Sequence, residues 1–118
     1  FQLFITAPLL SVHTINKCIK LLRTRKKYDS IFTCHNIYSW FWFQKKPINY
    51  LPKVLPRSQD AKPITMETTG LYGIKSNALK KYKCRIGKKP FFYEVSKKES
   101  LDLDTEEDFK ILKTYLKK

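Results

Sequence analysis

Two aspartates separated by a single leucine, Asp102 and Asp104, are the residues of this 118-residue chain whose type and spacing best suit chemistry. In an extended segment, side chains two positions apart point to the same side, so both carboxylates can converge on one hard cation. Magnesium is bound in proteins by one or two carboxylates, and substrate phosphates and water complete its coordination. The pair therefore predicts a partial magnesium site that a phosphate-bearing substrate would complete.

The acidic residues after this pair have a structural explanation. Six of the ten Asp and Glu residues lie within 99–108. Thr105 and Asp108 have the spacing of a capping box, and acids in a first helical turn are favoured by the helix dipole. The acids that begin this helix therefore need no function. The two aspartates before the cap are not explained in this way, and the alternative to a metal site is an exposed loop pair without a ligand.

The composition is that of one folded domain. With 42% hydrophobic residues, the chain can bury one core. No segment is long enough to span a membrane, and residues 1–10 lack the basic leader and cleavage site of a signal peptide, so we expect a cytoplasmic protein. Cys18, Cys34 and Cys84 are an odd number at wide spacings, which argues against a disulfide framework or a zinc module. We expect reduced, buried thiols.

A formal net charge of +14 would attract a phosphate backbone. The lysines are spread over several separate stretches, however, and no nucleic-acid-binding motif occurs among them. The same charge would attract a small anion such as a nucleoside triphosphate or a sugar acid. We therefore expect no nucleic-acid partner, and a nucleic-acid-binding module remains an alternative that the charge alone suggests.

The elements that must position the aspartates begin with a strand at 1–5, a helix from Ser11 or Thr14 to about Lys26, and a strand at 31–34. Strand, helix and strand in this order are typical of a right-handed crossover, which predicts an α/β fold with a mainly parallel sheet. The elements expected later are a turn entering a strand at 67–74, a short helix at 76–82, a strand at 91–95, and a helix at 105–117 with Phe109, Leu112 and Leu116 facing inward. Gly70 and Gly73 permit close approach of a ligand, or serve tight packing.

Residues 38–60 form an aromatic and proline-rich excursion from this pattern. The run 38–43 is apolar on both faces, which indicates either core burial or a subunit interface. The prolines that follow predict an irregular exposed loop, and long loops of this kind are often functional. We expect this excursion at a dimer interface.

Seven short motifs follow one another along nearly the whole chain. They are Thr6-Ala7-Pro8-Leu9, Tyr28-Asp29-Ser30-Ile31-Phe32-Thr33, Lys46-Pro47-Ile48-Asn49-Tyr50, Pro56-Arg57-Ser58-Gln59-Asp60, Glu67-Thr68-Thr69-Gly70-Leu71-Tyr72, Arg85-Ile86-Gly87-Lys88-Lys89-Pro90 and Ser100-Leu101-Asp102-Leu103-Asp104. Each is weak alone, but in this order they resemble the acylneuraminate cytidylyltransferase (CMP-sialic acid synthetase) family.

The resemblance implies a Rossmann-like nucleotide-diphospho-sugar transferase fold, usually dimeric. It implies that CTP and a 2-keto sugar acid react, with Mg2+, to give a CMP-sugar and pyrophosphate. Asp102 and Asp104 would be the catalytic metal ligands, which agrees with in-line attack on a phosphate whose charge a metal ion neutralises. Arg57 would bind the sugar carboxylate through its planar fork of donors. The other expected substrate-binding residues are Thr6, Gln59 and Gly70.

The chain also departs from the family pattern. The family's first strands and the glycine-rich, basic loop that holds CTP have no counterpart here, and Phe4 and Leu10 replace residues that are commonly polar and basic. We therefore expect residues 1–118 to be a partial cytidylyltransferase domain that is inactive in isolation. The alternative is a noncatalytic, truncated remnant that associates with a partner chain through an exposed sheet edge.

Overall fold

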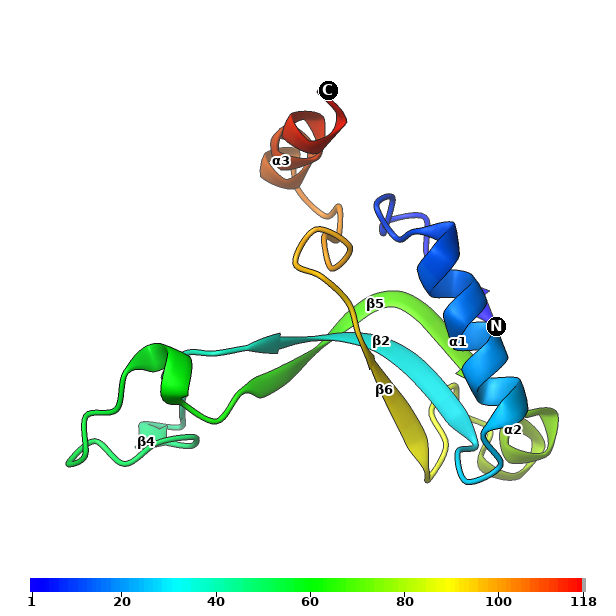
Figure 1. The fold of residues 1–118 in the computed structure, drawn as a ribbon, viewed down its shortest axis with the longest axis horizontal. Helices are drawn as coiled ribbons and strands as arrows, with labels where there is room; N and C mark the ends of the chain where they lie inside the picture. Colours follow the sequence, from blue (N-terminus) through cyan, green and yellow to red (C-terminus); the bar gives the residue numbers. More distant parts are fainter. Residues whose placement is uncertain (118) are drawn as a thin grey trace. The chain divides into compact units, whose positions relative to one another are not determined.

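The computed structural model describes residues 1–117, which fall into two compact units. The larger unit comprises Phe1–His35 and the described residues from Glu67 onwards, and the smaller unit comprises Asn36–Met66. In chain order the elements are β1 (Gln2–Leu3), α1 (Val12–Thr24), β2 (Ser30–Ile37), β3 (Trp42–Phe43), β4 (Lys46–Pro47), the 3-10 helix η1 (Ser58–Asp60), β5 (Ile64–Ile74), α2 (Ser76–Tyr82), β6 (Pro90–Glu94) and α3 (Glu106–Leu116) (Figure 1). The predicted α/β class is confirmed.

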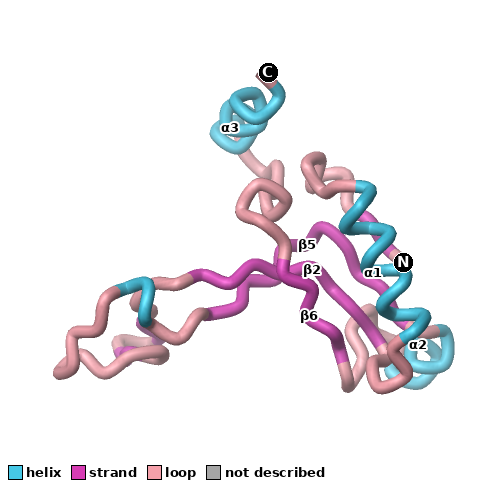
Figure 2. The backbone as a smooth tube through the Cα atoms, viewed as in Figure 1, coloured by secondary structure: helices cyan, strands magenta, loops and turns pink. Residues whose placement is uncertain are grey.

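The larger unit is built on a four-stranded mixed sheet with the order β1-β5-β2-β6. β1 pairs antiparallel with β5, and β6 pairs parallel with β2. Antiparallel strands dominate, so the prediction of a mainly parallel sheet is wrong for the described residues. The pattern at the start of the chain located β1, α1 and β2, but it could not show that β5, a later segment, lies between β1 and β2. β5, β2 and β6 run side by side in Figure 2.

Helix α1 covers one face of this sheet with its apolar stripe. Ser11 is its N-cap, and the Ser11 hydroxyl accepts a hydrogen bond from a backbone amide of the first turn at 3.1 Å. The helix ends at Thr24, close to the predicted end. The buried cluster on this face consists of Cys18, Leu22, Ile31 and Leu71. The prediction of this helix, which was based on the apolar stripe and the N-cap, is confirmed.

A second apolar cluster lies among the residues next to Ile31 and Leu71 along β2 and β5. It consists of Phe32, Cys34 and Tyr72, with Phe4 and Ile86 packed against it. Successive residues of a strand point to opposite faces, so both strands are apolar on both sides. This second cluster carries the aromatic part of the candidate site described below.

The later elements of the larger unit lie close to their predicted ranges. Helix α3 begins with the predicted capping box, in which Thr105 and Asp108 bind each other's backbone amides. Of the three apolar side chains predicted to face inward, only Leu112 is buried, whereas Phe109 is 50% and Leu116 65% exposed. The expectation that all three face inward is therefore wrong, because helical spacing places residues on one stripe but does not show how much of the stripe is covered. Among the described residues, no helix has both the length and the apolar character needed to cross a bilayer.

The three cysteines are free thiols, as predicted. Burial raises the pKa of Cys18 to about 12, and burial also raises the pKa of Cys34, so both remain protonated at neutral pH. Cys84, by contrast, is exposed, which corrects the expectation that all three lie in the core.

Gly73 lies where β5 passes closest to its neighbours. A Cβ atom at this position would come within 2.5 Å of the Phe1 ring and within 2.9 Å of the Ile31 side chain. Real Cβ atoms do not approach so closely, so this glycine serves tight packing and not the approach of a ligand.

In the smaller unit, β3 and β4 form a hairpin with a two-residue loop. Trp42 lies opposite Pro47, and the turn residues Gln44 and Lys45 both have positive φ angles, 47° and 64°. Two consecutive left-handed residues are the signature of a type I′ turn. Within the apolar run at 38–43, only the last two residues, Trp42–Phe43, form a strand.

Aromatic contacts and one asparagine organise the rest of the smaller unit. The Trp42 indole donates to the Tyr50 hydroxyl at 2.9 Å, and the Trp40 ring stacks on Tyr50 with 5.5 Å between centroids. The Asn49 amide binds three backbone groups: it accepts from Phe41 N and donates to the carbonyls of Ser39 and Lys62. Trp40 and Trp42 remain 44% and 55% exposed, so the apolar run is not buried within this unit.

Candidate functional site

Three segments that are distant in the sequence meet in the larger unit: the turn at Thr6, β5 at Gly70, and the loop that carries Asp102. The backbone amide of Leu103 donates to the Thr6 carbonyl at 2.8 Å. A Cβ atom on Gly70 would lie 3.4 Å from the Ala7 side chain, so β5 packs directly against the Thr6–Ala7 turn. The structure thus brings together three of the predicted site residues.

Asp102 is the residue of this group whose carboxylate is incompletely paired. Its Oδ2 accepts a hydrogen bond from the Thr69 hydroxyl at 2.6 Å. Its Oδ1 is buried and has no hydrogen-bond partner within residues 1–117. A buried acceptor without a partner costs free energy, and buried charges are normally paired or bound to metal ions. The Oδ1 atom is therefore suited to a cation or to a hydrogen-bond donor of a ligand.

Thr69, which positions Asp102, has an unusual backbone conformation. Its φ angle is 54°, in the left-handed region that a β-branched residue rarely occupies. The Thr69 hydroxyl also lies 2.7 Å from the Thr68 carbonyl, so its single hydrogen serves two acceptors. Strained residues of this kind cluster at functional sites. Sequence reasoning expected a turn here but gave Thr69 no role, and its place directly before Gly70 in that turn is the signal that could have found it.

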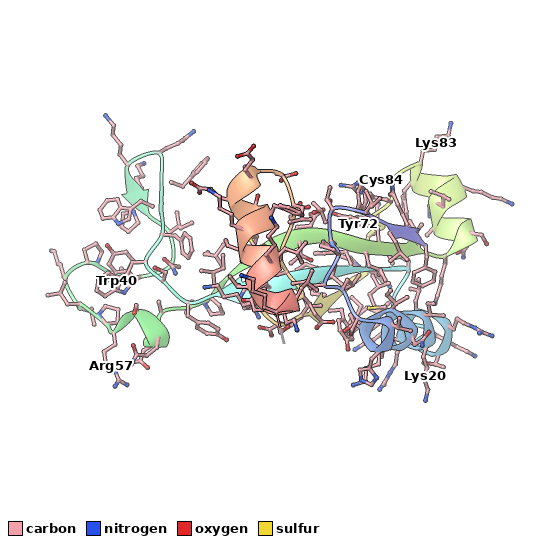
Figure 3. The ribbon with its side chains drawn as sticks, turned by 90° about the horizontal axis from the view of Figure 1, so that it is seen from above. Lys20, Trp40, Arg57, Tyr72, Lys83 and Cys84 are labelled. Atoms are coloured by element: carbon pink, nitrogen blue, oxygen red, sulfur yellow. The ribbon has the colours of Figure 1, made fainter. Side chains whose placement is uncertain are left out.

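A polar and aromatic group missed by sequence reasoning lies on the same strand. The Tyr72 hydroxyl donates to the Glu67 carboxylate, and the Arg85 guanidinium lies over the Tyr72 ring, 4.0 Å from its centroid. Tyr72 is buried and is labelled in Figure 3. Burial, followed by the hydrogen bond to Glu67, raises the pKa of Tyr72 to about 12, so the phenol is a protonated donor at neutral pH. The nearby Asp102 charge raises this pKa as well, while the Arg85 charge lowers it.

Asp104 differs from Asp102 in its surroundings. It is exposed, and its backbone amide donates to Asp108 Oδ2 at 3.1 Å, which joins it to the capping box of α3. Within residues 1–117, no group of three or more His, Cys, Asp or Glu side chains is arranged to hold a metal ion. A metal bound by Asp102 and Asp104 would therefore need further ligands from elsewhere.

Glu99 anchors the loop that carries Asp102. Its Oε1 accepts hydrogen bonds from the Ser11 hydroxyl at 2.7 Å, the Thr14 hydroxyl at 2.7 Å and the Ser11 amide at 3.1 Å. Burial alone would raise the pKa of Glu99, but these hydrogen bonds outweigh it and lower the pKa. The acid thus fastens the loop to the first turn of α1.

Arg57 and Gln59 belong to the smaller unit, at the start of η1 and within it. Arg57 makes a two-pronged contact with Asp60, with Nε 2.7 Å from Oδ2 and an NH2 group 3.3 Å from Oδ1. Its side chain is 73% exposed. Gln59 is exposed too. The donor fork of Arg57 is therefore already occupied by a neighbouring carboxylate.

Comparison with known proteins supports the family resemblance. The chain is similar to N-acylneuraminate cytidylyltransferase A from Danio rerio, with 25% identity over 114 residues. The predicted resemblance is borne out. The alignment covers 90% of this chain, and the chain spans about a quarter, 26%, of the length of that relative. No protein-family model matches the chain.

Proposed function

We propose that this chain carries part of the active site of a cytidylyltransferase, which joins CTP to a 2-keto sugar acid of the sialic-acid type and releases pyrophosphate. The observation that carries the proposal is the buried Oδ1 of Asp102, which has no partner within residues 1–117 and is held beside the Thr6 turn and Gly70. The similarity to a cytidylyltransferase supports the reaction class.

The donor set fits magnesium as a partial site. Asp102 offers one buried oxygen that has no other partner in the described part of the chain, and Asp104 offers an exposed carboxylate two residues later. Carboxylates completed by phosphate oxygens and water are the usual ligands of this ion. When bound, Mg2+ would neutralise charge on the phosphates during displacement of pyrophosphate.

The chain's own residues keep this acid oriented. Thr69 occupies Oδ2 of Asp102 and leaves Oδ1 for the ligand. Glu99 and the Leu103 amide hold both ends of the short loop around Asp102. A carboxylate held in this way does not have to reorganise when the charge of the transition state develops.

Arg57 and Gln59 are proposed to contact the sugar acid, as the resemblance implies. Because Asp60 already binds the Arg57 fork, a substrate carboxylate could bind there only by replacing Asp60. Thr6 and Gly70 are proposed to line the substrate pocket.

The complete protein is proposed to be a cytoplasmic homodimer with a Rossmann-like nucleotide-diphospho-sugar transferase fold, in which residues 38–60 lie at the subunit interface. The exposed Trp40, Trp42 and Phe43 of the smaller unit support the interface. The groups that hold CTP are expected from outside these 118 residues, so the isolated chain would be inactive.

A noncatalytic remnant that binds a partner chain is the second candidate function. β1 is one of the two edge strands of the sheet, so its outer edge can accept a further strand. A folded, monodisperse monomer in size-exclusion chromatography with light scattering would contradict this candidate.

The test of the main proposal is pyrophosphate release by the longest natural protein that contains this chain, supplied with CTP, Mg2+ and N-acetylneuraminate or a 3-deoxy-2-keto sugar acid. The double variant Asp102→Asn/Asp104→Asn is expected to lose turnover by at least about 100-fold, since it removes charge stabilisation worth several kcal/mol. Circular dichroism should show an unchanged fold.

Glu107→Gln is the matched control, because it removes an exposed acid of the α3 first turn. It should keep turnover within about twofold, given the small energy of a single exposed charge near a helix end. No turnover with any acidic sugar would refute the proposed reaction, and full turnover by the double variant would refute the metal role.

A further inference from the structure

The motif Arg85–Pro90 has no role in the proposed reaction, yet the structure fixes it firmly. The Gly87 amide donates to the Ser30 hydroxyl at 2.9 Å. The amides of Lys88 and Lys89 both donate to the Asp29 carboxylate, at 2.9 and 3.0 Å. The Tyr-Asp-Ser motif therefore clamps the turn that follows Arg85.

The Arg85 guanidinium packs against two aromatic rings. It lies 4.0 Å from the Tyr72 centroid and 5.6 Å from the Phe4 centroid. Phe4 in turn contacts Tyr72 edge to face, at 5.9 Å. Stacking on aromatic rings restricts a guanidinium to one plane and leaves its edge for hydrogen bonds.

Within residues 1–117, the polar contact of that edge is an ion pair with Glu67. Arg85 makes no hydrogen bond among residues 1–117, and its side chain is 46% exposed. This ion pair is long: an Arg85 NH2 nitrogen lies 3.8 Å from Glu67 Oε1, which is beyond hydrogen-bond distance. The Glu67 oxygen instead accepts from the Tyr72 hydroxyl. Arg85 is thus paired with Glu67 by charge, but its N–H donors are not taken up by hydrogen bonds within residues 1–117.

The strand under the fork also positions the candidate metal ligand. β5 carries both Tyr72, on which Arg85 stacks, and Thr69, which binds Asp102. A hollow of about 200 Å³ opens beside the guanidinium, lined also by Ile74 and Leu79, which leaves room for the body of a ligand. Phe4 stands where the resemblance leads us to expect a polar side chain, so the aromatic support under Arg85 accompanies the loss of that group.

We propose that Arg85 binds the carboxylate of the acidic sugar and determines the specificity of this chain for an acid over its neutral analogues. A planar fork of donors matches the two oxygens of a carboxylate. The ligand class rests on the proposed function. Arg57, by comparison, has the tighter partner, because Asp60 binds it through two hydrogen bonds whereas Glu67 lies 3.8 Å from Arg85.

The test compares an acid with its neutral ester. Binding of N-acetylneuraminate and of its methyl ester to the longest natural protein containing this chain is measured by calorimetry or ligand-observed NMR, without CTP. Wild type should prefer the acid. Arg85→Gln should weaken acid binding by about 10- to 100-fold, as expected for a lost hydrogen-bonded ion pair, and ester binding by less than about twofold. Arg85→Lys should recover only part of the loss, because an ammonium cannot replace the fork.

Lys83→Gln is the matched control, since it removes the same charge two residues away on the exposed end of α2 (Figure 3). It should leave both affinities unchanged. An equal loss for acid and ester in Arg85→Gln would mean a structural role and would overturn the proposal. So would an unchanged acid preference, a loss confined to CTP binding, or no binding of the acid to wild type.

The two proposals fail separately. Acid binding that depends on Arg85 without pyrophosphate release would refute the reaction and keep this inference. If the protein turns over and Arg85→Gln leaves the KM for the sugar acid unchanged, the proposed reaction is kept and this inference is refuted.

Discussion

The hydroxyl of Thr69 should be worth more to stability than an ordinary surface threonine, and three substitutions can measure this. Thr69→Val keeps the β-branched shape and the left-handed backbone but removes the donor to Asp102 Oδ2. A hydrogen bond to a charged group contributes about 1.5–3 kcal/mol. Thr69→Val should therefore lower the free energy of unfolding by about that amount, because both carboxylate oxygens of Asp102 would then lack partners.

Thr69→Ser and Thr69→Gly separate the hydroxyl from the backbone strain. The serine keeps the donor and should stay within about 1 kcal/mol of wild type. The glycine loses the donor but relieves a left-handed conformation that costs a residue with a side chain about 1–2 kcal/mol, so it should be more stable than the valine variant. The expected order of stability is wild type and serine, then glycine, then valine.

Urea unfolding followed by circular dichroism at 222 nm is the appropriate assay, because both tryptophans belong to the smaller unit and this site belongs to the larger one. In an Asp102→Asn background the cost of Thr69→Val should shrink, since the charged acceptor is gone. A valine variant as stable as wild type, or a serine variant as unstable as valine, would refute the reasoning.

Two further predictions concern the clamps around the site. Glu99→Gln should reduce stability most above pH 4.5, the ordinary pKa of a glutamate, and the difference from wild type should vanish as the pH falls through the lowered pKa of folded Glu99. Urea titrations at several pH values would show this, and a pH-independent difference would contradict it. Gly87→Ala should lower the free energy of unfolding by about 1–3 kcal/mol, because the new Cβ atom would lie 2.3 Å from Asp29 Oδ1. Gly70→Ala should cost less, because its nearest contact would be at 3.3 Å, and equal thermal shifts for both variants would contradict this.

The sequence predicted those elements whose signals are local. Ser11 with an apolar stripe indicated α1, and Thr105 with Asp108 indicated the start of α3. The position of β5 within the sheet could not be predicted, because pairing between distant strands leaves no mark within a short window. The exposure of Phe109 likewise depends on coverage by neighbours and not on spacing.

The candidate site was predicted in part for the same reason. The spacing of Asp102 and Asp104 can be recognised in the sequence. Gly70, which lies near Asp102 in space, can be recognised there as a turn residue. The roles of Thr69 and Arg85 depend on contacts between separated segments, namely Thr69 with Asp102 and Arg85 with Tyr72 and Phe4. A pattern along the chain does not contain those contacts.

Cys84 offers a practical consequence of the distribution of the thiols. It is the exposed cysteine of the three and the residue directly before Arg85, whereas Cys18 and Cys34 are buried and have raised pKa values. Thiolates and not thiols react with maleimides, so a fluorophore would attach at this position without any engineered cysteine. The native chain can thus carry an optical reporter immediately beside the arginine whose occupancy matters most.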